Sequence, residues 1–174
     1  MKSSRSSRSN SGLTIIGWRE HIALPEFGIN TMPAKIDTGA RTSALHAVDQ
    51  VLLDLDGVKW VEFMIPVHNR RTNQRLRAPF LEERDIKNTG GVPERRFVVR
   101  TQLEIGHRSW RIDVSLANRE KMEFDIILGR SAIRGRDHLV DPGRSFVLGQ
   151  PEARRKAVSR AVLWVNPENQ GEEE

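Results

Sequence analysis

The stretch Ala34-Lys35-Ile36-Asp37-Thr38-Gly39-Ala40-Arg41-Thr42-Ser43-Ala44-Leu45-His46-Ala47 decides the fold of this chain. An apolar residue precedes Asp37, and a hydroxyl, a glycine and a second apolar run follow it, so we expect a strand to end at Asp37 inside the core. A carboxylate there must be paired, neutralised or hydrogen-bonded. Gly39 allows backbone or substrate to approach where a Cβ atom would block it. This pattern favours a carboxylate that activates water.

A single carboxylate does not complete that chemistry. Aspartic proteases use two carboxylates that share one proton, because like charges at close range cannot both ionise. The chain contains a single Asp-Thr-Gly sequence, so a second aspartate has to come from a second subunit. We therefore expect a symmetric homodimer whose two-fold axis passes between the two Asp37 side chains.

A second motif follows much later in the chain, in Asp125-Ile126-Ile127-Leu128-Gly129-Arg130-Ser131-Ala132-Ile133. It is a β-branched apolar run that closes on a glycine and leads into a short predicted helix. Asp-Thr-Gly-Ala followed by Ile-Leu-Gly-Arg resembles the paired signature of retropepsins, which are single-domain aspartic proteases that work as homodimers. The string from Lys35 to Ala47 looks like a bacterial and archaeal branch of that clan, often labelled ATP-dependent zinc proteases. The resemblance covers residues 13–150.

The resemblance implies catalytic roles for the first motif. Asp37 would be the catalytic aspartate, Thr38 would hydrogen-bond across the dimer beneath the active site, and Gly39 would offer its backbone to the substrate. Ala40 and Arg41, which follow directly, are candidate substrate-binding residues. All five residues are expected to lie in one turn at the end of the strand.

The resemblance gives the second motif a supporting role. Leu128, Gly129 and Arg130 would pack behind Asp37 and begin the short helix. Many retropepsins place an acid directly after Asp-Thr-Gly-Ala, where it meets the arginine of the later motif, whereas this chain has Arg41 at that position. Arg130 therefore needs another partner.

A flexible hairpin tip is predicted at 88–93, between strand-like residues 77–86 and 97–105. In a retropepsin the flap lies in this part of the chain, where it excludes water and clamps an extended peptide. Gly90 and Gly91 are therefore candidate substrate-binding residues. An ordinary surface turn is the alternative interpretation.

Short strands separated by turn residues predict the rest of the architecture. Hairpins are expected at Asp56-Gly57 and Gly106-His107, and short strands at 139–144 and 145–148 complete the pattern. Together with the resemblance, this predicts a mainly β fold: a closed antiparallel β barrel of retropepsin type, with one short helix after Arg130.

The 174-residue chain is expected to hold one domain, at 13–150. Residues 1–12 form a predicted disordered basic tail. Residues 151–174 form a C-terminal extension with a predicted helix over 152–165 and an acidic end. The chain has no cysteine, no signal-peptide pattern and no apolar run that could span a membrane, so we expect a cytoplasmic protein without a membrane partner.

Other chemistries find little support in the sequence. The five histidines form no His-Glu-x-x-His pair, and no phosphate-binding glycine loop with lysine is present, so neither zinc nor ATP is predicted as a cofactor. His46 reads as a structural histidine. The arginine-rich run at 68–77 lacks interleaved aromatic residues, so a solvated hairpin is favoured over nucleic-acid binding.

The sequence thus predicts an aspartic endopeptidase that acts as a homodimer on a peptide or protein substrate. The net charge of +5 and a basic set of residues favour acidic, glutamate-rich substrates; that set is Arg41, Arg70, Arg71 and Arg130. The alternative is a non-catalytic dimeric β-barrel module that binds an acidic partner.

Overall fold

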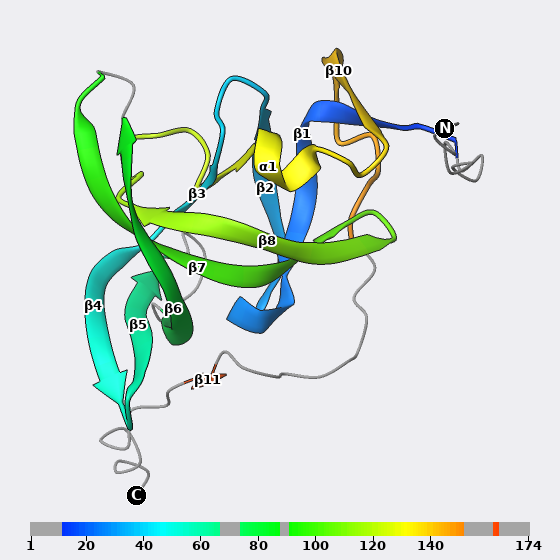
Figure 1. Ribbon diagram of the computed structural model, residues 1–174. Helices are drawn as coiled ribbons and strands as arrows, with labels where there is room; N and C mark the ends of the chain where they lie inside the picture. The colour runs from blue at the N-terminus through cyan, green and yellow to red at the C-terminus, as the bar shows by residue number, and fades with distance from the viewer. Residues whose placement is uncertain (1–11, 67–73, 88–90, 152–161, 164–174) are drawn as a thin grey trace, which may run out of the picture.

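The computed structural model describes residues 12–66, 74–87, 91–151 and 162–163. Strands dominate this part of the chain (Figure 1). They are β1 (Thr14–Leu24), β2 (Ile29–Asp37), β3 (Ser43–His46), β4 (Val48–Leu55), β5 (Val58–Ile65), β6 (Gln74–Lys87), β7 (Pro93–Ile105), β8 (Arg108–Ala117), β9 (Ile126–Gly129), β10 (His138–Ser145) and β11 (Val162–Leu163). A 3-10 turn spans Pro25–Phe27, and the short helix α1 spans Arg130–Ile133, where a helix was predicted.

Six strands close into a ring in the order β1-β2-β9-β3-β8-β7. The ring closes where Ile22 and Ala23 of β1 pair with Ile105 and Glu104 of β7. Strand β10 pairs with β1 outside this ring, and β6, β5 and β4 continue the sheet beyond β7 (Figure 1). One apolar cluster fills the interior, and its buried members include Ile22, Leu45, Phe63, Leu103 and Ile126. The mainly β fold and the single short helix are confirmed for the described residues.

The sequence predicted antiparallel pairing throughout the sheet, and this prediction is wrong. Three pairs are parallel among the described strands: β1 with β10, β2 with β9, and β3 with β8. Parallel neighbours require a long crossover rather than a tight turn. The chain between Asp37 and Ile126 provides such a crossover, so β9 returns beside β2 in the same direction and ends next to it.

The predicted hairpins at Asp56-Gly57 and Gly106 are confirmed. Asp56 and Gly57 both have positive φ, 54° and 78°, which matches the twist of the two-residue turn joining β4 to β5. Strands β6 and β7 also form a hairpin, in which Lys87 faces Pro93. Gly90, at its predicted tip, lies outside the described residues. The two short strands expected over 139–148 form a single strand, β10, that ends at Ser145.

The predicted helix over 152–165 is wrong for the two residues of it that the structure describes. Val162 and Leu163 form β11, which pairs antiparallel with Arg77 and Leu76 of β6. Strand β6 extends beyond its pairing with β7, so its open edge can accept an extended segment. All but the last residue of the predicted basic tail (1–12) and most of the arginine-rich run (68–77) lie outside the described residues. None of the helices in the described ranges is long and apolar enough to cross a bilayer.

A buried carboxylate joins β1 to the segment that follows β10. Glu20 on β1 is fully buried, and its side chain accepts hydrogen bonds from three backbone N–H groups. The donors are Gly17 at 2.7 Å, Val147 at 2.9 Å and Leu148 at 3.2 Å. A carboxylate without a counter-ion is tolerated inside a protein when backbone donors satisfy it in this way. Glu20 therefore fixes the segment after β10 against β1.

Candidate active site

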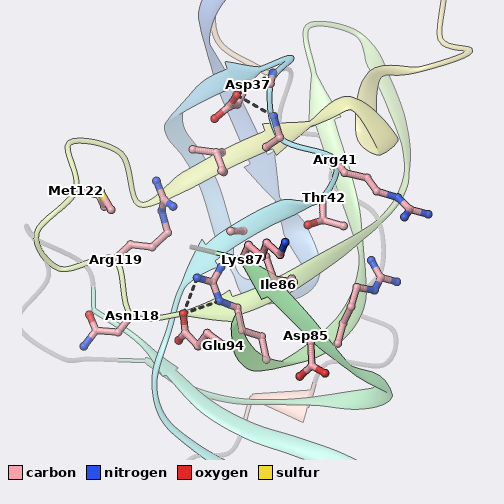
Figure 2. Close-up of a pocket in the computed structure, with 16 residues that line it drawn as sticks. Asp37, Arg41, Thr42, Asp85, Ile86, Lys87, Glu94, Asn118, Arg119 and Met122 are labelled. Atoms are coloured by element: carbon pink, nitrogen blue, oxygen red, sulfur yellow. Dashed lines mark hydrogen bonds and ion pairs between the residues drawn. The ribbon is translucent and has the colours of Figure 1, made fainter. Parts of the chain in front are cut away.

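Asp37 is the last residue of β2, and the turn that follows holds its side chain. The backbone N–H groups of Gly39 and Ala40 both donate to Oδ1 of Asp37, each at 3.1 Å (Figure 2). These two bonds orient the half-buried carboxylate and leave Oδ2 for other interactions. The sequence folds this way locally because Gly39, with no side chain, can bring its N–H close to the carboxylate; a Cβ atom there would lie 3.2 Å from Oδ1.

The second motif clamps this active-site turn, residues 37–42, from behind. Gly129 lies beside Asp37 in the parallel register of β2 and β9. A Cβ atom on Gly129 would lie 2.5 Å from the carbonyl carbon of Thr42, so only glycine fits. The next two backbone N–H groups, of Arg130 and Ser131, donate to the carbonyls of Ala40 and Arg41 at 2.9 and 3.1 Å. Leu128, which precedes Gly129 in β9, is fully buried in the core.

Arg130 finds its partner in the backbone of the active-site turn. Its Nη1 donates to the carbonyl oxygens of Thr38 at 2.8 Å and of Gly39 at 3.0 Å. These carbonyls replace the acid that follows Asp-Thr-Gly-Ala in many retropepsins. The guanidinium thereby fixes two peptide groups next to Asp37 while both Thr38 and Gly39 remain exposed on the surface of this chain.

A pocket of about 890 Å³ opens beside the turn. Asp37, Gly39, Ala40 and Arg41 line one side of it. The end of β6 and the start of β7 line the opposite side, with the loop after β8 between them (Figure 2). The β6–β7 hairpin and Asp37 thus line the same pocket, and the flap role of this hairpin stays a prediction. Gly91 is not among the lining residues, which are instead its neighbours on the two strands.

Cations outnumber carboxylates around the pocket. Asp37, Asp85 and Glu94 face five cations, of which one is Arg41 and four form what we call the basic wall: Arg84, Lys87, Arg96 and Arg119. Two members of the wall are paired, Arg84 with Glu82, and Arg96 with Glu94 at 2.6 Å. The basic wall favours anionic groups in the pocket, because attraction is strengthened in a concave site.

Arg119 and His46 contribute to the site in ways that sequence reasoning did not anticipate. His46 is buried, and its Nδ1 accepts a hydrogen bond from the backbone N–H of Arg119 at 2.9 Å. The structural role predicted for His46 is therefore confirmed, but its partner is the loop that carries a pocket cation. Burial lowers the pKa of Arg119 from its usual value, and the nearby Arg96 lowers it further, while Asp125 and Asp37 oppose the shift. No local sequence signal connects residues so far apart in the chain.

Within the described ranges, no three His, Cys, Asp or Glu side chains converge into a group that could hold a metal ion. The pocket is lined by the oriented carboxylate of Asp37, two further carboxylates, several guanidinium groups, one lysine and the backbone of an exposed turn.

Comparison with known proteins places these features in context. The model of a family described as retropepsin-like aspartic endopeptidase RimB matches residues 15–151. A probable alpha-L-glutamate ligase of Parasynechococcus marenigrum is 42% identical over 137 residues, which are 78% of this chain and 29% of that protein. A protein with the same description from Desulfotalea psychrophila is 41% identical over 138 residues, 78% of this chain and 30% of that protein. The chain thus spans less than a third of the length of these curated relatives.

A solved structure shares the fold. The crystal structure of Lpg0085 from Legionella pneumophila, described as a protein of unknown function (DUF785), superposes with a TM-score of 0.68 at 27% sequence identity. The match covers 78% of this chain and 98% of that one. It therefore includes nearly the whole of the Legionella chain.

Proposed function

Because this chain belongs to the RimB-like family of retropepsin-like aspartic endopeptidases, we propose that it is an aspartic endopeptidase. The observation that carries the proposal is the oriented carboxylate of Asp37, which ends β2 at the edge of a large pocket and is held by Gly39 and Ala40. A water molecule between two such carboxylates can attack a peptide carbonyl.

The second carboxylate is proposed to be Asp37 of a partner copy. Within one chain, the other two carboxylates of the pocket face cations: Glu94 pairs with Arg96 at 2.6 Å, and Asp85 lies 3.6 Å from Arg95. Neither is therefore proposed as the proton-sharing partner of Asp37. The exposed Thr38 and Gly39 beside it offer a surface on which a symmetric copy can pack.

The proposed reaction uses the two aspartates in complementary protonation states. The ionised Asp37 takes a proton from the water while the water oxygen bonds to the carbonyl carbon of the peptide. The protonated Asp37 of the other subunit donates a hydrogen bond to the carbonyl oxygen. Collapse of the tetrahedral intermediate breaks the C–N bond, and the amine leaves with a proton from the pair. The pair titrates as one coupled unit.

The proposed substrate is an acidic peptide or protein segment. The support is the excess of cations in the pocket, where Arg41 is the one member of the sequence-predicted basic set that lines it among the described residues. Arg70 and Arg71 lie outside the described residues, and Arg130 is engaged by the turn carbonyls. The relatives' description as probable alpha-L-glutamate ligases makes bonds between glutamates good first candidates.

Cleavage profiling of a mixed peptide library by mass spectrometry, from acid to neutral pH, tests this function. We expect Asp37→Asn to abolish cleavage, and a zinc chelator to leave the wild-type cleavage unchanged. Light scattering should report a dimer for both proteins. Cleavage that survives in Asp37→Asn and is lost with chelator would overturn the proposal in favour of a zinc enzyme. A dimer that cleaves no peptide would favour the acidic-partner binding module.

A further inference from the structure

Arg119 differs from the paired arginines of the basic wall. In the described part of the chain, no salt bridge to a carboxylate is found for Arg119, whereas Arg84 and Arg96 each have one. Among the residues that the structure describes, its guanidinium makes one hydrogen bond, from Nε to the carbonyl of Phe124 at 3.1 Å. A guanidinium carries five N–H donors. Most of its donors therefore remain available to a ligand in the pocket.

The surroundings of Arg119 make it costly to leave its charged guanidinium without a carboxylate ligand. Arg119 is half-buried, so its charge has lost part of its hydration. Arg96, from β7, repels it, and the charges of Asp125 and Asp37 oppose this repulsion. A carboxylate arriving in the pocket would add a negative charge at the guanidinium and accept two parallel hydrogen bonds.

The side chain is also held in place before any ligand arrives. The backbone N–H of Arg119 is bound to buried His46, and its Nε is bound to Phe124. These two contacts fix the backbone nitrogen and Nε of Arg119. The guanidinium points toward the Asp37 side of the pocket (Figure 2). A preorganised donor loses less conformational entropy on binding than a flexible lysine does.

We propose that Arg119 is the specificity-determining residue of this site and binds the carboxylate of an acidic side chain adjacent to the scissile peptide bond. The inference rests on the proposed function, because adjacency follows from Arg119 and Asp37 lining one pocket. It assigns recognition to one residue of the loop after β8, held in position by His46, rather than to the general positive charge of the chain.

Binding to an inactive enzyme tests the inference without depending on cleavage. In the Asp37→Asn background, isothermal titration should show that the peptide Ala-Ala-Glu-Glu-Ala-Ala binds at least tenfold more tightly than its twin with two central glutamines. Adding Arg119→Met should reduce this ratio to about one, and Arg119→Lys should retain part of it. Arg100→Met, which removes an equal charge from an exposed ion pair with Asp113 outside the pocket, is the matched control and should leave the ratio unchanged.

Charge reversal in the active enzyme gives a second, independent readout. Arg119→Glu should lower kcat/KM for the glutamate peptide by more than tenfold and raise it for a twin with two central lysines, while thermal unfolding confirms that the fold is kept. An unchanged glutamate-to-glutamine binding ratio in Arg119→Met would overturn the inference, even if wild-type protein is a peptidase. A wild type that cleaves nothing, but whose Asp37→Asn form shows Arg119-dependent binding, would overturn the peptidase instead and support the carboxylate site.

Discussion

The active-site turn and the basic wall face each other across one pocket, yet they are built by different means. The turn is held mainly by its own backbone and that of the segment behind it: Asp37 accepts two N–H bonds, and the Gly129–Ser131 segment supplies two more to the turn carbonyls. The side chain of Arg130 adds two hydrogen bonds to the same backbone. The wall is made of long side chains, of which Arg84 and Arg96 are held by neighbouring carboxylates on the same strands.

This difference predicts where the site can vary. A backbone-held turn depends on a few positions that admit no other residue, and strain there displaces the reacting groups. A wall of side chains can exchange one cation for another while keeping its overall charge. Chemistry is therefore expected to reside in the turn, and substrate preference in the wall.

The largest effect is expected from Gly129→Ala, which would break the turn. The new Cβ atom would overlap the backbone of Thr42, and β9 cannot move away from the turn without losing its pairing with β2. We expect the free energy of unfolding to fall by about 3 kcal/mol, measured by urea denaturation. Gly143→Ala is the control: its Cβ atom would meet only Asp141 Oδ1 at 3.4 Å, so a loss below about 1 kcal/mol is expected. Equal losses in the two variants would contradict the steric argument.

Arg130→Met should weaken the turn without removing its backbone clamp. The two hydrogen bonds to the carbonyls of Thr38 and Gly39 disappear, while Gly129 and the N–H of residue 130 stay in place. We expect kcat to fall by about 10- to 100-fold, because small displacements of a reacting group are costly. Steady-state kinetics at matched dimer concentration measures this. A variant impaired only in KM would instead assign Arg130 to substrate binding.

A middle-sized effect is expected from an ion-pair cluster between β5, which carries Glu62, and β6, which carries Arg75 and Arg77. Burial of Glu62 works against its ionisation, but hydrogen bonds and charges from Arg75 and Arg77, at 2.7 and 2.8 Å, outweigh it and hold the pKa of Glu62 below 4.5. A depressed pKa stabilises the fold above the unfolded-state pKa, and this contribution is lost as pH falls through the folded-state value. Glu62→Gln should therefore cost about 1 kcal/mol at neutral pH and progressively less below pH 4.5. Thermal melts across pH test it; a gap that persists in acid would contradict it.

The smallest effect is expected from Lys87→Met in the basic wall itself. Lys87 is exposed, and no ion pair is found for it among the described residues. Its removal should change stability by less than about 0.5 kcal/mol. It should raise KM for an acidic peptide by roughly threefold at low salt and less at high salt, because exposed charges are screened. A large fall in kcat would contradict the assignment of the wall to substrate preference.

The same contrast explains what the sequence could predict. The turn, the glycine behind it and the short helix are encoded in two contiguous motifs, so their local structure could be read directly. The hairpins at Asp56-Gly57 and Gly106 could also be read, because turns that require positive φ have a short sequence signature. The roles of these residues in catalysis remain predictions.

The basic wall could not be predicted from the sequence, because its residues come from separate parts of the chain that only the folded topology brings together. Nothing near Arg119 in the sequence indicates that His46 orients it, since β3 and β8 become parallel neighbours only in the folded sheet. The parallel pairs were missed for a related reason: strand patterns report which face is buried, not which strand lies alongside. The partner of Arg130 could not be predicted either, because it is a backbone carbonyl and every residue has one.

The Glu20 contact with Val147 and Leu148 has a consequence for the order of folding during synthesis. Strand β1 is made first, but its parallel neighbour β10 and the N–H groups that satisfy its buried carboxylate are among the last parts of the matched region to leave the ribosome. Until then Glu20 has to stay hydrated, and β1 cannot settle fully into the ring. At about 5–20 residues per second, the nascent domain waits several seconds with an incomplete edge. We therefore expect the final step of folding to join the first-synthesised part of the matched region to its last-synthesised part.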